Sequence, residues 1–253
     1  MRKFTDIYYT DTKLNMQMLD MYLPDTEGFP VFVFFHGGGL EHGDRTHCQC
    51  LAGYLPRRGV GIVSVEYRMY PDAKYPEFIE DAAAAVKWTI DNIGAYGGNG
   101  QIFVGGSSAG GYLSQMLCFD EKYLAKHGVS LLDITGFIHD AGQPTAHFNV
   151  LREKGIDSRR IIVDETAPLW YVGLAEKYPP MLFTWSDNDM MGRPEQLLLL
   201  LKTLEHFEYD MTTVDTMVMH GKHCHYCGML DENGESVHGK MVFPFIAKYS
   251  NLA

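Results

Sequence analysis

The sequence lacks long hydrophobic runs and clusters of basic residues. Its longest aliphatic run, Leu197 to Leu201, is too short to cross a membrane. The N-terminal stretch MRKFTDIYYTDTKLN has no apolar core of the length that a signal peptide needs. The formal charge is −11, and no stripe of Lys and Arg is present to attract nucleic acid or an anionic membrane. We therefore expect neither nucleic acid nor membrane as a partner.

Cysteine is also scarce. Five cysteines, an odd number in 253 residues, do not resemble a disulfide framework, so we expect reduced thiols and a cytoplasmic location. Cys224 and Cys227 form a C-x-x-C pair within HCHYC, with His223 and His225 beside them. A second C-x-x-C is absent, and a zinc site requires four ligands. We therefore interpret these cysteines as thiols and expect no metal and no cofactor.

Segments rich in β-favouring residues alternate with segments of helical periodicity along the chain. Strands are expected at 4–9, 16–23, 31–35, 60–67, 101–106, 134–138, 181–185 and 211–219. Helices are expected at 47–58, 76–98, 111–119, 194–207 and near 237–249. This alternation predicts an α/β fold with a mostly parallel, doubly wound sheet of about eight strands and an antiparallel start. We expect one domain over 1–253, with any small lid or substrate-shaping insertion within 120–178, which fits the alternation worst.

The stretch FVGGSSAGGYL joins an expected strand to an expected helix. The nucleophile-elbow pattern G-x-S-x-G fits when it starts at Gly106, which makes Ser108 the candidate nucleophile. A start at Gly105 places Ala109 at the fifth position and fails. The alternative interpretation is a glycine-rich turn without chemistry.

A second glycine-rich loop, HGGGL, follows the strand VFVFF. Backbone N–H groups at Gly38 and Gly39, together with that of Ala109, are suited to an oxyanion hole for a tetrahedral intermediate. A tight turn is the alternative. A phosphate-binding loop is disfavoured, because no P-loop lysine follows.

Together the two loops resemble the hormone-sensitive-lipase-like and carboxylesterase (acetyl esterase) branch of the α/β-hydrolases, in which HGGG precedes a GDSAGG-type elbow. The resemblance extends over about residues 29–225 and includes VEYRMYPDAKYP. Two positions depart from the pattern: Ser107 stands where the elbow usually has an acid, and Leu40 where an aromatic residue usually follows the glycines. HGGG begins at residue 36, so the large N-terminal cap of many relatives is not expected and the site should be open and compact.

The order Ser, acid, His in this family implies an acid and a histidine downstream. In the loop SDNDMMGRPEQ the resemblance favours Asp189, with Asp187 as the alternative. In the loop HGKHCHYC it favours His223 over His220 and His225.

The implied function is a serine carboxylic-ester hydrolase with an acyl-enzyme intermediate, acting on short-chain acyl or aryl-acyl esters, with acetyl groups on carbohydrates as one candidate substrate. The expected partner is a small-molecule ester, and the oligomeric state is left open. Phe148, Trp170 and Tyr171 are candidate pocket residues. Two alternatives remain: an amide or peptide hydrolase such as a formamidase, and a non-catalytic binding protein on a hydrolase scaffold.

Overall fold

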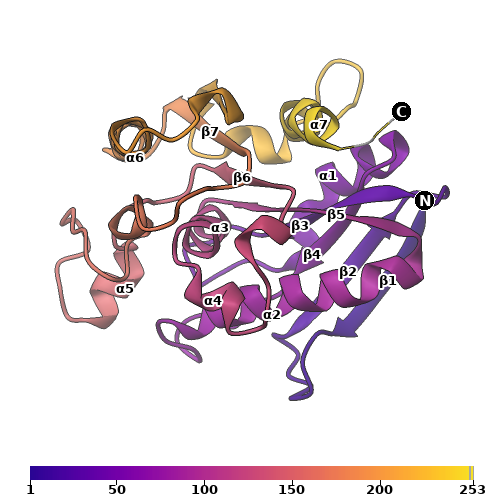
Figure 1. The fold of residues 1–253 in the computed structure, drawn as a ribbon, viewed down its shortest axis with the longest axis horizontal. Coiled ribbons are helices and arrows are strands. Elements are labelled where there is room, and N and C mark those ends of the chain that lie inside the picture. The colour runs from indigo at the N-terminus through magenta and orange to yellow at the C-terminus, as the bar shows by residue number, and fades with distance from the viewer. Residues whose placement is uncertain (251, 253) are drawn as a thin grey trace.

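One mixed β-sheet organises the computed structural model, which describes residues 1–250 and 252. In this part of the chain, eight strands run in the order β1-β2-β4-β3-β5-β6-β7-β8 (Figure 1). The strand β2 is antiparallel to both of its neighbours, and the remaining pairs are parallel. The predicted α/β-hydrolase fold with an antiparallel start is therefore confirmed. The strands are β1 (Arg2–Tyr8), β2 (Met18–Leu23), β3 (Phe29–Phe35), β4 (Gly61–Val65), β5 (Gly98–Ser107), β6 (Gly136–Asp140), β7 (Met181–Asn188) and β8 (Val214–Lys222).

The helices follow the predicted order, with some changes of boundary. The α-helices are α1 (Gln49–Tyr54), α2 (Glu77–Asn92), α3 (Ala109–Phe119), α4 (Lys122–Ala125), α5 (Phe148–Glu153), α6 (Arg193–His206) and α7 (Val237–Tyr249). The helix expected over 47–58 is divided into 3₁₀ turns around a short α1. The helix expected over 76–98 ends at Asn92, and Gly98, the last residue of the expected range, is the first residue of β5.

The strand β3 shows why the sheet is covered on both faces. All seven of its residues are buried. Alternate side chains of a strand point to opposite faces. Val31, Val33 and Phe35 accordingly join the core formed with α2, α3 and α6. Phe32 and Phe34 join a separate core formed with α1 and α7. The continuous apolar run in the sequence therefore reflects burial on two sides.

The region 120–178 contains one strand of the sheet and one long connection. Its strand, β6, was expected at 134–138 and lies at 136–140. Residues 141–180 then leave the sheet and carry α5 and a 3₁₀ helix, η5 (Pro168–Tyr171), before β7 begins. Figure 1 shows α5 and its loops projecting from the outer edge of the molecule. A single domain with a lid in this region stays a prediction.

Two further features concern compartment and membrane. All five cysteines are free thiols in the structure. Within residues 1–250 and 252, none of the helices combines the length and apolar character that a membrane crossing requires. The cytoplasmic location remains a prediction from sequence.

Candidate active site

Ser108 occupies a sharp turn between β5 and α3. Its φ of 56° and ψ of −110° lie in a region that non-glycine residues rarely adopt. Two backbone hydrogen bonds hold this conformation: the Ser108 N–H donates to the Asp140 carbonyl at 2.7 Å, and the Tyr112 N–H donates to the Ser108 carbonyl at 2.9 Å. Strained conformations of this kind persist where the surroundings hold them, and they occur often at active sites.

The flanking glycines are required by close backbone contact. A Cβ atom added at Gly106 would lie 2.4 Å from the Phe35 carbonyl oxygen, and one added at Gly110 would lie 2.0 Å from the same atom. Neither distance is tolerable without movement of β3. The two outer positions of G-x-S-x-G therefore accommodate only glycine here, which agrees with the register that selects Ser108.

The structure brings Ser108, His223 and Asp189 together. His223 Nε2 lies 2.7 Å from Ser108 Oγ, and His223 Nδ1 lies 2.5 Å from Asp189 Oδ1. This geometry allows the imidazole to accept the serine proton while the carboxylate orients the ring. The alternative residues Asp187 and His220 contact each other at 2.7 Å, both exposed.

Asp189 is built to remain charged. Its side chain is fully buried, and burial by itself disfavours the carboxylate. Hydrogen bonds from His223 and from the backbone N–H groups of Met190 and Ser186 outweigh burial and hold the pKa of Asp189 below its ordinary value. A fixed negative charge therefore faces the Nδ1 side of His223.

Ser107 faces a different carboxylate, that of Asp140 at the end of β6. Ser107 Oγ donates to Asp140 Oδ2 at 2.5 Å. The hydroxyls of Thr184 and Tyr226 both donate to Asp140 Oδ1. Asp140 is 1% exposed, so these donors replace the water that a charged carboxylate would otherwise bind. Ser107 therefore belongs to a buried hydrogen-bond network and not to the pair formed by His223 and Asp189.

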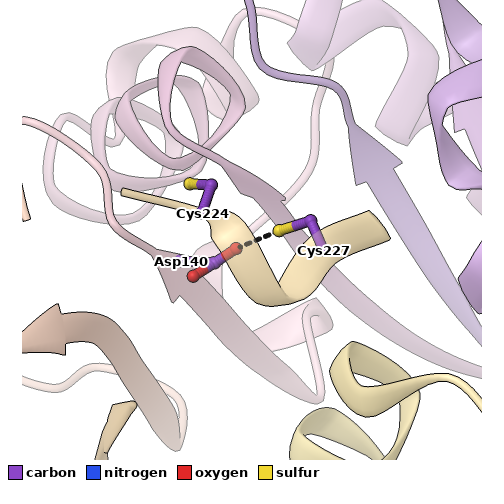
Figure 2. Close-up of side chains that lie close together, drawn as sticks. All are labelled: Asp140, Cys224 and Cys227. Atoms are coloured by element: carbon purple, nitrogen blue, oxygen red, sulfur yellow. Dashed lines mark hydrogen bonds between the residues drawn. The ribbon is translucent and has the colours of Figure 1, made fainter. Parts of the chain in front are cut away.

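Cys224 and Cys227 lie between this buried network and the candidate triad, and Figure 2 shows the two cysteines beside Asp140. Cys227 Sγ lies 3.4 Å from Asp140 Oδ2, and Cys224 Sγ lies 3.7 Å from His223 Nε2. The two thiols and one carboxylate oxygen all lie within 4.8 Å of one another. These are three donor atoms for a metal, one fewer than a closed tetrahedral zinc site has. The Asp140 carboxylate is moreover already engaged by three hydroxyl groups.

The loop HGGG is held by its first residue. His36 is fully buried and stacks on the Tyr67 ring at 4.5 Å between ring centroids. The Tyr67 hydroxyl donates to the His36 carbonyl at 2.8 Å, and Glu66 Oε1 lies 3.3 Å from His36 Nε2. On the other side of the loop, Asn149 of α5 donates from Nδ2 to the Gly39 carbonyl at 2.5 Å.

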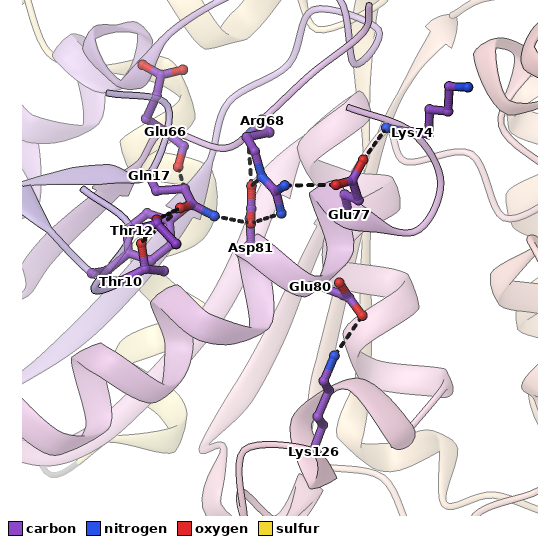
Figure 3. Close-up of polar contacts among 11 residues, drawn as sticks. Thr10, Thr12, Gln17, Glu66, Arg68, Lys74, Glu77, Glu80, Asp81 and Lys126 are labelled. Carbon is purple, nitrogen blue, oxygen red and sulfur yellow. Dashed lines mark hydrogen bonds and ion pairs between the residues drawn. The ribbon is translucent and has the colours of Figure 1, made fainter. Parts of the chain in front are cut away.

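The segment that carries Glu66 and Tyr67 is anchored in turn to α2 (Figure 3). The Arg68 guanidinium makes two hydrogen bonds of 2.8 Å with the buried carboxylate of Asp81, and the Gln17 side-chain amide donates to the same carboxylate at 2.6 Å. Arg68 also contacts Glu77 at 2.8 Å. This network fixes the chain after β4, on which the glycine loop rests.

The predicted oxyanion-hole residues lie beside Ser108. A Cβ atom at Gly37 would lie 3.3 Å from Ser108 Cβ, so the glycine loop runs directly against the turn. Gly38 and Gly39 have φ values of 118° and 68°, which favour glycine. Ala109 is the first residue of α3, and its N–H therefore has no carbonyl partner within the helix.

These elements surround a cavity of about 830 Å³. Phe34, Phe148 and Met190 contribute apolar walls, and Glu41 and His42 contribute polar groups. Of the three candidate pocket residues, only Phe148 lines this cavity.

The other two aromatic candidates lie elsewhere. Trp170 is 55% exposed on η5, and the Tyr171 hydroxyl donates to the Glu165 carbonyl at 2.8 Å. The structure therefore does not bring Trp170 or Tyr171 to the cavity. An aromatic residue in an irregular segment carries no sequence signal of which surface it joins.

Neither Asp140 nor Asn149 was predicted from the sequence. The expected strand ended at residue 138, two positions before Asp140. A signal was available, because the carboxyl ends of neighbouring parallel strands lie at one edge of a sheet. Asn149 had no comparable signal, since its contact with Gly39 depends on the path of the long connection.

Comparisons with known proteins identify esterase relatives over part of the chain. A family model described as BD-FAE matches residues 19–129. Esterase LipI of Mycobacterium tuberculosis is 38% identical over 96 residues, which cover 37% of this chain and 30% of LipI. The 3-O-acetylpapaveroxine carboxylesterase CXE2 of Papaver somniferum is 31% identical over 132 residues, 41% of each chain. The chain thus spans less than half the length of these curated relatives.

Similar folds are found in solved esterase structures. Esterase B from Lactobacillus rhamnosis (HN001) has a TM-score of 0.77 and 20% identity, with coverage of 97% of this chain and 85% of that one. Esterase Est2 of Thermogutta terrifontis has a TM-score of 0.75 and 18% identity, with coverage of 99% and 93%. The fold is that of the α/β-hydrolases. Over the matched segments, the chain is similar to carboxylesterases and to the BD-FAE family model.

Proposed function

We propose that this protein hydrolyses carboxylic esters, with Ser108 as nucleophile, His223 as general base and acid, and Asp189 as the residue that orients His223. The observation that carries the proposal is the continuous contact from Ser108 Oγ through His223 to Asp189, at 2.7 and 2.5 Å. The esterase relatives support the same reaction class.

The mechanism follows from the positions of these groups. Ser108 Oγ attacks the ester carbonyl while His223 Nε2 accepts its proton and passes it to the leaving alcohol. The N–H groups of Gly38, Gly39 and Ala109 stabilise the oxyanion. Water then attacks the acyl-enzyme, with His223 again acting as the base.

The size of the cavity favours a small-molecule ester in which either the acyl group or the alcohol is larger than a few atoms. About 830 Å³ is more than an acetyl group fills, and it leaves room for an aryl-acyl group or for a sugar as the alcohol. Phe34 and Phe148 suit an aromatic or aliphatic group, whereas Glu41 and His42 suit hydroxyl groups. We therefore propose short-chain or aryl-acyl esters, including acetylated carbohydrates.

A fluorophosphonate probe and a substrate panel test the reaction class. The probe should label the wild-type protein at Ser108 and should leave Ser108→Ala unlabelled. The panel should compare p-nitrophenyl esters of increasing chain length with formyl and aryl amides. Faster hydrolysis of amides would assign an amidase. Absence of both labelling and turnover would favour a binding protein on a hydrolase scaffold.

A further inference from the structure

The pair Cys224 and Cys227 is arranged for contact between its two sulfur atoms. Cys224 is the residue before the 3₁₀ helix η7 (His225–Gly228), and the Cys227 N–H donates to the Cys224 carbonyl at 3.1 Å. Cys224 itself has a left-handed backbone (φ 50°), and this hydrogen bond across the turn keeps the two residues close together. The two sulfurs lie within 4.8 Å of each other, so modest side-chain rotation would bring them to bonding distance.

Both thiols are also reachable from outside. Cys224 and Cys227 are partly exposed, and both line the cavity that contains Ser108. Cys48 and Cys118, by contrast, are fully buried. Cys50 of α1 lines the same cavity and is the remaining accessible thiol.

The surroundings favour a thiolate at Cys227. A hydrogen bond from the Cys224 thiol lowers the pKa of Cys227, and the charge of His238 adds to this effect, whereas burial and the Asp140 carboxylate, 3.4 Å from Cys227 Sγ, oppose it. His238, on α7, is fully buried, and its pKa is raised by Cys227 and Asp140 even though burial opposes protonation. Asp140 of β6, the neighbouring Tyr226 and Cys50 of α1 complete the titratable surroundings of Cys227.

We propose that Cys224 and Cys227 form a redox-active dithiol on the wall of the catalytic cavity, which reacts with small-molecule disulfides and closes to an internal disulfide. Cys227 is the attacking thiolate and Cys224 the resolving thiol. The inference does not depend on ester hydrolysis, because its chemistry uses neither Ser108 nor an ester.

The reaction balances as two thiol–disulfide exchanges. The Cys227 thiolate attacks one sulfur of the small disulfide, forming a mixed disulfide and releasing one thiolate. Cys224 then loses its proton to His223, whose Nε2 lies 3.7 Å from Cys224 Sγ, and attacks Cys227 Sγ. The bond between Cys227 and the small molecule breaks, and a second thiolate leaves. The protein dithiol is oxidised, and the small disulfide is reduced to two thiols.

Oxidised glutathione is a suitable probe, and the sequence provides a simple readout. Trypsin cleaves after Lys222 and Lys240, so one peptide, 223–240, carries both cysteines. After incubation of the folded, reduced protein, this peptide should be about 2 Da lighter, because a disulfide contains two fewer hydrogens than a dithiol. Two accessible thiols should be lost, and no glutathione should remain attached.

Three variants separate the two sulfurs. Cys224→Ser should stop at the mixed disulfide and keep glutathione on Cys227. Cys227→Ser should form neither product in the peptide 223–240. The matched control Cys50→Ser removes the other accessible thiol of the cavity and should close the disulfide as the wild type does.

The electrostatic part has a separate readout. The rate at which iodoacetamide alkylates Cys227 should rise with pH. Its midpoint should lie below the value of about 8.5 that is usual for a free thiol. His238→Gln should raise that midpoint, and thermal unfolding should verify that the variant is folded. The proposal is overturned if the folded wild type retains both thiols in excess oxidised glutathione, if it keeps a mixed disulfide, or if Cys227 links to Cys50 instead.

Discussion

The two adjacent serines of the elbow should respond very differently to loss of the hydroxyl group. Ser108 Oγ contacts His223, whereas Ser107 Oγ donates to the buried carboxylate of Asp140. Ser108→Ala should lower kcat by roughly 10⁶-fold, the scale found when a serine hydrolase loses its nucleophile. Ser107→Ala should keep kcat within a few-fold, because its hydroxyl contacts Asp140 and not His223.

The cost of Ser107→Ala should appear in stability. A hydrogen bond to a charged group contributes about 1.5–3 kcal/mol to the free energy of unfolding. Thr184 and Tyr226 still donate to Asp140 in the variant, so the carboxylate remains partly satisfied and the lower end of this range is expected. In a protein of this size each kcal/mol corresponds to roughly 2–4 °C in Tm. We therefore expect a loss of about 3–6 °C.

The assay combines saturating p-nitrophenyl acetate hydrolysis with thermal unfolding of both variants. Ser108→Ala should be inactive with a Tm near that of the wild type. Ser107→Ala should be active with a lowered Tm. A loss of kcat in Ser107→Ala comparable to that in Ser108→Ala, in a protein that is still folded, would refute the assignment of the nucleophile.

Two further predictions concern the acid of the triad and the response to pH. Asp189→Asn should lower kcat by about 10⁴-fold, because an amide no longer fixes the His223 tautomer, whereas the matched change Asp187→Asn at the exposed contact should alter kcat less than a few-fold in the same assay. Similar losses in both variants would contradict the choice of Asp189. Burial lowers the pKa of His139 and of His147 to about 3, whereas a histidine in the unfolded chain has a pKa of about 6.5. Below pH 6.5 the unfolded state therefore binds more protons than the folded state. The free energy of unfolding should fall as the pH decreases from 6.5 toward 3. Between pH 6.5 and pH 5, each of the two histidines should account for a decrease of about 2 kcal/mol in the free energy of unfolding, as measured by urea unfolding. His139→Gln should remove about half of this pH dependence. A free energy of unfolding that does not change with pH over this interval would contradict the buried neutral state.

The sequence was informative wherever a local pattern has only one structural solution. The elbow register is an example, since the Phe35 carbonyl leaves no room for a side chain at Gly106 or Gly110. Asp189 and His223 were predicted through the resemblance to the α/β-hydrolases, and both lie in loops after parallel strands, which meet at one edge of the sheet. Trp170 was not predictable in the same way. Its exposure depends on how the connection from β6 to β7 folds, and no periodic pattern governs that path.

Asp140 lies where Ser107 departs from the elbow pattern of the α/β-hydrolases that the sequence resembles. Ser107 replaces the usual acid, but β5 and β6 are paired in a register that sets Ser107 directly opposite Asp140. A carboxylate is therefore still present behind the nucleophile turn, supplied by the neighbouring strand instead of by the elbow. The backbone carbonyl of Asp140 also accepts a hydrogen bond from the Ser108 N–H. Asp140 therefore holds the conformation of Ser108 with its backbone and binds the Ser107 hydroxyl with its side chain. A linear motif cannot reveal this contact, because Ser107 and Asp140 are 33 residues apart in the sequence and are brought together only by the pairing of β5 with β6.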